Sequence, residues 1–157
     1  MRKKQAKKVE LSGAERIRIG VVVSRYLEEI TDQLLQGALS TLKSHGVADE
    51  SINIIDVSGS FEIPYGCLTL LSKSKPDAII ALGCIVKGET NHDRYIASAV
   101  SHGIMQLSLQ YKTPISFGVI TTNTLKQAKA RSSGDSNKGT EAAIAALQSA
   151  LLKARSF

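Results

Sequence analysis

The sequence predicts an α/β domain in which helices cover both faces of a parallel β-sheet. Four runs are almost continuously apolar and rich in β-branched residues, which is typical of parallel strands buried on both faces. These runs are residues 17–23, 52–57, 78–85 and 115–121. Helical patterns separate them, so that strands and helices alternate along the chain. Right-handed crossovers then place helices on both sides of one sheet, giving a three-layer α/β/α architecture.

The first two helices are indicated by an apolar stripe and by residues that favour helix ends. Residues 28–45 repeat an apolar side chain at every fourth position from Ile30 onward, and Gly46 is suited to end this helix. The next helix is expected over residues 61–74. Pro64 falls in its first turn, where the missing N–H costs no hydrogen bond.

We expect three further helices, over residues 91–111, 125–130 and 138–155. The first of these carries Ile96 and Val100 on one face, and Pro114 separates it from the fourth strand. The last two are joined by the polar loop 132–137, and loops of this kind in compact folds often carry function. No linker or internal repeat divides the chain.

The charge of the chain is concentrated at its start. The net charge is +6, but residues 1–18 hold seven Lys and Arg against Glu10 and Glu15, a balance of +5. The other 139 residues therefore carry only +1, which argues against a nucleic-acid-binding body. We interpret residues 1–16 as a basic tail, either simply solvated or an arm for an acidic partner, and residues 17–157 as a single domain.

Composition indicates a protein that neither spans nor enters a membrane. The longest apolar stretch is far shorter than the roughly 20 residues needed to cross a bilayer, and no signal peptide is expected. Cys67 and Cys84 lie in apolar contexts without metal-like spacing, as buried reduced thiols of a cytoplasmic protein do.

Polar and aromatic residues follow each predicted strand. Because the carboxyl ends of parallel strands share one edge of the sheet, these groups are expected to meet there, where α/β proteins bind ligands. Tyr26 and Phe61 are two of only seven aromatic residues, and their presence at this edge favours a planar ligand. Rim packing is the alternative role for each of them.

The segment after the third strand has the properties of an anion site. Gly88 allows close backbone approach, and Thr90 and Asp93 have capping-box spacing at a helix start, with N–H groups that favour a phosphate. Glu89 fits such a site only through its backbone N–H. His92 is placed to transfer protons near neutral pH, a structural histidine being the alternative.

Two basic residues flank the polar loop near the C-terminus. Arg131 and Lys138 are each interpreted as solvated charges when taken alone. Lys138 at a helix start opposes the helix dipole, which predicts a nearby acidic or polar partner.

Six short segments, taken together in their order and spacing, resemble those of a known protein family. They read Val-Val-Val-Ser-Arg-Tyr at 21–26, Gly-Ser-Phe-Glu-Ile-Pro at 59–64, Ala-Leu-Gly-Cys-Ile-Val-Lys-Gly-Glu-Thr-Asn-His at 81–92, Phe-Gly-Val-Ile-Thr-Thr at 117–122, Gln-Ala at 127–128 with Arg131, and Asn-Lys-Gly-Thr-Glu-Ala-Ala at 137–143. With these segments the body of the chain, from about Ile17 to Leu152, resembles the 6,7-dimethyl-8-ribityllumazine synthase family.

The resemblance implies a flavodoxin-like sheet with strand order 2-1-3-4 and an enzyme of riboflavin biosynthesis. The implied reaction is the penultimate step of that pathway. It condenses 5-amino-6-(D-ribitylamino)uracil with 3,4-dihydroxy-2-butanone 4-phosphate to give 6,7-dimethyl-8-ribityllumazine, orthophosphate and water. No metal and no organic cofactor is implied.

The resemblance also implies a role for each site residue. His92 would be the catalytic proton-transfer residue. The butanone phosphate would be bound by Glu89, Thr90 and Arg131. The ribitylaminouracil would be bound by Tyr26, which stacks on the ring, and by Ser60, Phe61, Glu62, Cys84, Ile85, Val86, Phe117 and Lys138.

Several positions depart from the family pattern. Leu27 replaces an Asn that often follows the stacking aromatic residue, and Lys87 stands where Arg is common. Asp93 and Arg94 replace an aromatic–acidic pair after His92. These changes leave open a flavin-binding or shell-forming homologue with weak catalysis. A further alternative is the related archaeal-type riboflavin synthase.

The implied assembly is a pentamer whose active sites lie between adjacent subunits, with Phe117, Arg131 and Lys138 reaching a neighbour's site. Decamers and icosahedral shells of twelve pentamers also occur in the family, and the short loop 132–137 favours a shell. Residues 9–11 would add a strand to a neighbour's sheet.

Overall fold

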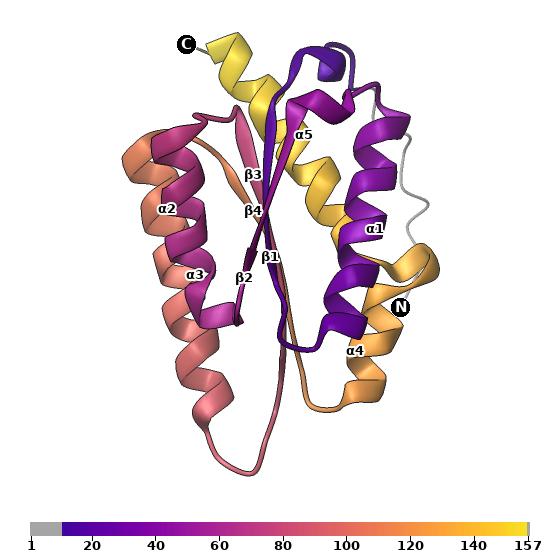
Figure 1. Cartoon of the computed structure of the whole chain (residues 1–157), viewed down its shortest axis with the longest axis vertical. Helices are drawn as coiled ribbons and strands as arrows, with labels where there is room; N and C mark the ends of the chain where they lie inside the picture. The colour runs from indigo at the N-terminus through magenta and orange to yellow at the C-terminus, as the bar shows by residue number, and fades with distance from the viewer. Residues whose placement is uncertain (1–10, 157) are drawn as a thin grey trace.

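The protein has the three layers expected from its sequence, as the computed structural model of residues 11–156 shows (Figure 1). Its main elements are β1 (Ile19–Ser24), α1 (Glu28–Ser44), β2 (Ile52–Val57), α2 (Ile63–Lys73), β3 (Ala78–Val86), α3 (His92–Tyr111), β4 (Ile115–Thr122), α4 (Leu125–Ser132) and α5 (Lys138–Ser156). The strands form one parallel sheet in the order β2-β1-β3-β4, which confirms the expected topology. Helices α2 and α3 cover one face, and α1, α4 and α5 cover the other.

The predicted apolar runs all become strands, but they are not equally buried. All six residues of β1 and eight of the nine in β3 are buried, because these strands lie inside the sheet. The expectation of burial on both faces is wrong for β2, which has exposed residues such as Ile54, and for the start of β4. Both are edge strands, so the rest of the chain covers them incompletely.

Two element boundaries differ from those predicted. β1 begins at Ile19 rather than at residue 17, because the Arg18 N–H donates to Asp77 Oδ2 at 2.7 Å instead of entering the sheet. The helix expected from residue 61 starts as a short 3₁₀ turn, Ser60–Glu62, and becomes α-helical at Ile63. Pro64 lies in the first turn of α2, as predicted.

The sheet separates two apolar clusters that share the central strands. Val21, Val23, Ile80 and Leu82 point into the cluster under α1 and α5. Val22 and Ile79 point into the cluster under α2 and α3. Because successive side chains of a strand point to opposite faces, a continuous apolar run in β1 and β3 serves both clusters at once.

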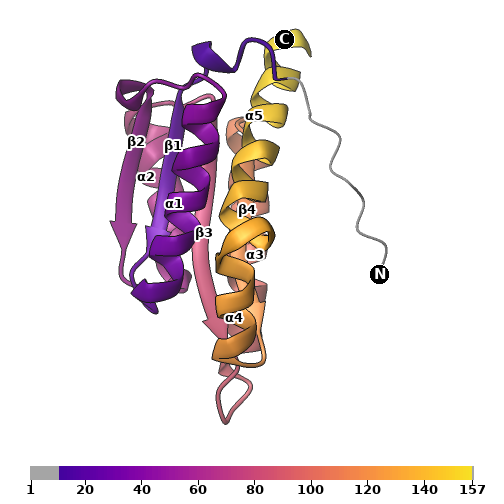
Figure 2. The same cartoon turned by 90° about the vertical axis from the view of Figure 1, so that its right-hand side faces the viewer.

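Helices α1 and α5 lie side by side and approach very closely (Figure 2). A Cβ on Gly139 would overlap the carbonyl of Leu34, so only glycine fits there. The buried Asn137 completes the contact. Its side-chain amide donates to Gln33 O and Ser132 O at 2.9 and 2.8 Å, and its Oδ1 accepts from Gly139 N at 2.8 Å. Asn137 therefore holds the start of α5 against α1 and the end of α4.

Part of the segment interpreted as a basic tail packs onto the body. Leu11 is buried, and Ala14 is buried within a short 3₁₀ turn, Ala14–Arg16. Both belong to the cluster under α1 and α5. The residues before Leu11, including two of the three residues 9–11 expected to pair with a neighbour, lie outside the described part of the chain. Within the described residues, no helix is both long and apolar enough to cross a membrane.

Replacing Gly139 by Ala tests the contact between α1 and α5. A Gly→Ala change in a helix is ordinarily stabilising, but here the added methyl meets the α1 backbone, which cannot move aside as a flexible side chain can. We expect Gly139→Ala to lower the free energy of unfolding by roughly 1–3 kcal/mol. Urea denaturation at matched protein concentration measures this change.

The control for that experiment is Gly88→Ala, where a Cβ would meet no heavy atom within 4 Å. It should leave the urea midpoint unchanged. A Gly139→Ala midpoint equal to that of the wild type would show that the close helix contact does not contribute to stability.

Candidate functional site

A cavity of about 510 Å³ opens at the carboxyl ends of the strands. Its size is typical of small-molecule sites, and its place is where parallel α/β sheets bind ligands. The residues that line it come from the turns after β1 and β2, from the end of β3 and the turn that follows it, and from the start of α3. They are Tyr26, Gly59, Ser60, Phe61, Glu62, Cys84, Ile85, Val86, Gly88, Thr90, His92, Asp93 and Ile96.

The turn after β2 brings an aromatic ring, a hydroxyl and a carboxylate to this cavity. Phe61 and Glu62 are exposed, whereas Ser60 is buried and its Oγ has no hydrogen-bond partner among the described residues. Ser60 lies against β3 because Gly83 has no side chain: a Cβ there would come within 2.8 Å of Ser60 Oγ. Ser60 and Glu62 thus offer polar groups for a hydroxylated ligand.

The end of β3 presents backbone rather than side-chain chemistry. Pairing between β1 and β3 ends at Val23 and Leu82, whereas pairing between β3 and β4 continues to Val86. Residues 83–86 therefore have one backbone edge without a neighbouring strand, at the wall of the cavity. The Cys84 side chain is 1% exposed, and burial raises the pKa of its thiol to about 11. The thiol is thus protonated near neutral pH and poorly suited to act as a nucleophile.

The start of α3 differs from the predicted capping box. The helix begins at His92, and Thr90 Oγ1 accepts from the His92 N–H at 3.3 Å rather than from that of Asp93. Asp93 does not complete a box. Its Oδ1 is buried and has no hydrogen-bond partner within residues 11–156. His92 is exposed, and its ring makes no hydrogen bond to the described residues. Glu89 is exposed beside the cavity and is not one of its lining residues.

The three remaining predicted residues line a second cavity, of about 460 Å³, between β4 and α5. Phe117 is 47% exposed on the edge strand. Arg131 donates from one guanidinium nitrogen to Gln127 O at 3.1 Å. Lys138 contacts both carboxylate oxygens of Glu141 at 2.9 Å, which supplies the acidic partner predicted for a lysine at a helix start. The single chain does not bring these residues into the first cavity.

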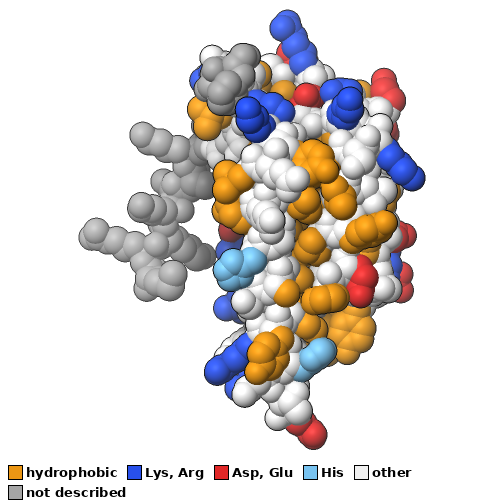
Figure 3. All heavy atoms as spheres, turned by 90° about the vertical axis from the view of Figure 1, so that its left-hand side faces the viewer, with side chains coloured by type: hydrophobic (Ala, Val, Ile, Leu, Met, Phe, Trp, Pro, Cys, Tyr) orange, Lys and Arg blue, Asp and Glu red, His pale blue; other side chains and the backbone are white. Residues whose placement is uncertain are grey.

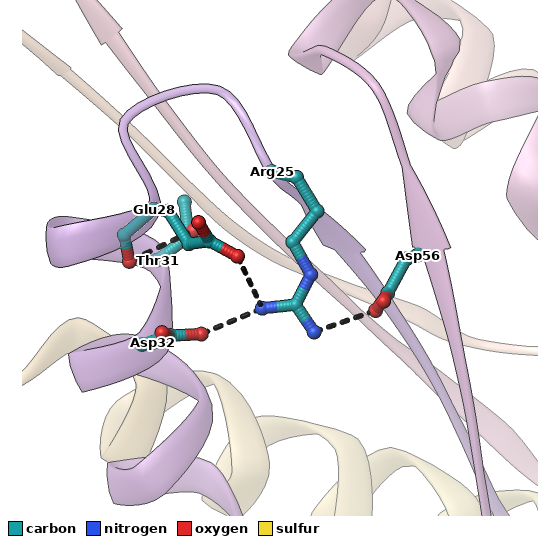
Figure 4. A network of polar contacts seen from close by, with 5 residues as sticks. All are labelled: Arg25, Glu28, Thr31, Asp32 and Asp56. Atoms are coloured by element: carbon teal, nitrogen blue, oxygen red, sulfur yellow. Dashed lines mark hydrogen bonds and ion pairs between the residues drawn. The ribbon is translucent and has the colours of Figure 1, made fainter.

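Two residues at or next to the first cavity were given no binding or catalytic role from the sequence, although Asp93 was expected to help cap α3. Asp93 lies on the same face of α3 as the buried Val100 and Ile104. Because a carboxyl group is costly to bury without a partner, an Asp on this apolar stripe indicates a position with a functional role. Of the two partners of Arg25, Asp32 is only seven residues ahead and Asp56 is 31 residues away, so the sequence alone does not show that both meet its side chain. Its two terminal nitrogens contact these carboxylates at 2.6 and 2.7 Å (Figure 4). The hydrogen bond to Asp56 is the main cause of a raised Arg25 pKa.

The described residues contain no group of three or more His, Cys, Asp or Glu side chains arranged to hold a metal ion. The first cavity offers aromatic surfaces, hydrogen-bonding side chains, unpaired backbone and one imidazole.

Comparison with known proteins identifies the family of this chain. Residues 16–154 match the family model described as 6,7-dimethyl-8-ribityllumazine synthase. A 6,7-dimethyl-8-ribityllumazine synthase of Phocaeicola vulgatus is 45% identical over 136 residues, which cover 86% of this chain and 81% of that protein. The Kosmotoga olearia protein of the same name is 46% identical over 140 residues, covering 88% and 90%.

A third relative with this name, from Porphyromonas gingivalis, is 44% identical over 138 residues, covering 87% of this chain and 86% of that protein. Family model and relatives both extend over nearly the whole described body. The chain belongs to the 6,7-dimethyl-8-ribityllumazine synthase family.

Proposed function

We propose that this protein is a lumazine synthase, which condenses 5-amino-6-(D-ribitylamino)uracil with 3,4-dihydroxy-2-butanone 4-phosphate. The products are 6,7-dimethyl-8-ribityllumazine, orthophosphate and water. Family membership supports the activity. The structural observation that carries the proposal is the shared cavity, where Tyr26, the Ser60–Glu62 turn, the end of β3, Thr90 and His92 meet.

The first substrate fits the aromatic and polyol-binding side of the cavity. Tyr26 and Phe61 are 66% and 61% exposed, so that both rings are available to a planar pyrimidine. The unpaired backbone of residues 83–86 matches the ring's polar edges. Ser60 and Glu62 supply hydrogen bonds for the ribityl hydroxyls.

The second substrate fits the start of α3. Thr90 and the N–H groups near Gly88 and Glu89 favour an anion, and the N-terminal end of the 20-residue helix α3 adds its dipole. His92, the first residue of α3, would lie between the two bound substrates. There it would transfer protons during imine formation between amine and ketone and during loss of phosphate.

Positioning supplies much of the proposed catalysis. The substrate amine is already a nucleophile, so holding it against the ketone converts a bimolecular step into an effectively unimolecular one. A general acid–base group such as His92 typically contributes a further ~10²–10⁴-fold. No covalent bond between enzyme and substrate is needed.

We further propose that the complete site forms between adjacent protomers of a pentamer. Homo-oligomers are a property of the family. The separation of Phe117, Arg131 and Lys138 from the first cavity supports this, since all three line the cavity at the edge strand β4. Arg131 keeps guanidinium donors for a phosphate held by a neighbour's Thr90.

An apolar surface over α2 and α3 supports the same assembly. Tyr65, Tyr95, Met105 and Leu109 are exposed there, and Figure 3 shows apolar side chains gathered on this face. Patches of this kind mark interaction sites. The short connection between α4 and α5 favours an icosahedral shell of such pentamers. A cytoplasmic location belongs to the same proposal and agrees with two buried free thiols, Cys67 and Cys84.

The direct test is formation of the lumazine chromophore by the purified wild-type protein from its two substrates. We expect turnover without added metal or cofactor. Binding of riboflavin without any chromophore formation would instead support a flavin-binding homologue.

His92→Ala and Arg131→Ala should affect different kinetic constants. Loss of a proton-transfer group lowers kcat by about 10²–10⁴-fold with little change in KM. Loss of a charge-assisted contact to phosphate raises KM for the butanone phosphate by roughly 10–100-fold and leaves KM for the pyrimidine unchanged. Steady-state kinetics with each substrate varied in turn separates the two effects.

Matched controls lie outside both cavities and outside the apolar surface of α2 and α3. His45→Ala at the end of α1 removes a histidine, and Lys126→Ala on α4 removes a cation. Both should keep wild-type constants. An unchanged kcat in His92→Ala would remove His92 from the mechanism.

The apolar surface can be tested by Leu109→Glu. Leu109 is 70% exposed in the single chain, so a charge there costs little in a monomer but would be buried in an assembly. We expect multi-angle light scattering to find pentamers or larger particles for the wild type and smaller species for Leu109→Glu. Leu125→Glu, on α4 away from this surface, is the control. Equal masses for wild type and Leu109→Glu would exclude this surface from the interface.

A further inference from the structure

We infer that Arg25 is a positioning residue that sets the orientation of Tyr26 and thereby the affinity for the planar substrate. The inference rests on the proposed function for the identity of the ring that Tyr26 meets. It concerns a residue that does not line the cavity itself.

The turn that carries Tyr26 is held on its α1 side by Leu27, whose side chain packs against the cluster under α1 and α5 and whose carbonyl accepts from the Ile30 and Thr31 N–H groups. Only residues 25–27 join β1 to α1. Leu27 has φ 58° and ψ 52°, a left-handed conformation that residues with a side chain rarely adopt, and it makes no side-chain capping bond to α1. The Tyr26 ring is 66% exposed and makes no hydrogen bond to the described residues. Its position is therefore decided by the backbone on either side of it.

Arg25 joins this turn to both β2 and α1 through one backbone and two side-chain hydrogen bonds. Its backbone N–H donates to Val57 O at 2.8 Å, at the end of β2. One guanidinium nitrogen contacts Asp56 Oδ1 of β2 at 2.7 Å, and the other contacts Asp32 Oδ1 of α1 at 2.6 Å (Figure 4). Glu28 Oε1 lies 4.0 Å from the second nitrogen. The residue before Tyr26 is thus joined to the strand on one side and to the helix on the other.

The charges make Arg25 difficult to replace. It is one cation among three carboxylates, Glu28, Asp32 and Asp56, and its side chain is 30% exposed whereas theirs are 54–65% exposed. Without Arg25, like charges on β2 and α1 would face each other across the turn. Lysine restores the charge, but a single ammonium does not reproduce a planar fork that points to two elements at once.

An ordinary surface ion pair would stabilise the fold without affecting substrate choice. The chain provides such a pair on the same helix: Lys43 near the other end of α1 contacts Asp49 at 3.2 Å, with both side chains more than half exposed. Lys43→Gln is therefore the matched control for Arg25→Gln.

The experiment compares wild type, Arg25→Gln, Arg25→Lys and Lys43→Gln. Affinity for 6,7-dimethyl-8-ribityllumazine is measured by fluorescence, and KM is measured for each substrate. Arg25→Gln should weaken lumazine binding and raise KM for the pyrimidine by about tenfold or more, because the stacking ring is misplaced. KM for the butanone phosphate should change by less than about twofold, since its subsite is on α3. Arg25→Lys should recover only part of the loss.

Amide exchange gives a readout that does not depend on activity. The Arg25 N–H is held by Val57 O, and the Ile30 and Thr31 N–H groups are held by Leu27 O. These amides should exchange faster in Arg25→Gln and at the wild-type rate in Lys43→Gln, with similar Tm values for the two variants.

The remaining results would contradict either the inference about Arg25 or the proposed function. Equal increases in both KM values, or full recovery by Arg25→Lys, would make Arg25 a structural or purely electrostatic residue. Unchanged lumazine binding in Arg25→Gln would overturn the inference outright. A wild-type protein that binds the lumazine but does not form it would overturn the proposed function alone. One that does neither would overturn both.

Discussion

The burial of β3 on both faces is the constraint around which the rest of the structure is arranged. Its side chains complete both apolar clusters, so helices must cover both sides of the sheet. β3 is also longer than β1, and its last four residues extend past their neighbour with one backbone edge unpaired. The strand that stabilises the core therefore also forms the wall of the cavity. Gly83 joins the two roles, because its missing side chain lets Ser60 approach.

The contact between α1 and α5 likewise both packs the core and positions a cavity. Asn137 satisfies both donors and the acceptor of its amide with backbone groups of three segments, and Gly139 allows the helix backbones to meet. A buried polar side chain with all its hydrogen bonds made specifies one geometry. That geometry fixes where α5 begins, at Lys138, and where α4 ends, at Ser132 next to Arg131, and hence the second cavity.

The two cavities differ in how they are built. The first is formed by turns that follow strands of one sheet, so its residues converge within a single chain. The second lies beside the edge strand β4, where the sheet has no further strand. A family that forms homo-oligomers can join such an edge to a neighbour's cavity. In that arrangement the chain would supply the ring and proton-transfer groups to one site and the basic groups to another.

Much of this protein was determined by local patterns in its sequence. Continuous apolar runs predicted the parallel sheet, and chain order placed Tyr26, Phe61, Glu62 and His92 at one edge, since strand ends of a parallel sheet must coincide. Six segments identified the family. Exposure of the edge strands and the placement of Phe117, Arg131 and Lys138 in a separate cavity were decided only by the tertiary structure. So were the contacts of Arg25 with Asp56 and of Asn137 with Gln33, because these partners are 31 and 104 residues apart and only the packed fold brings them together.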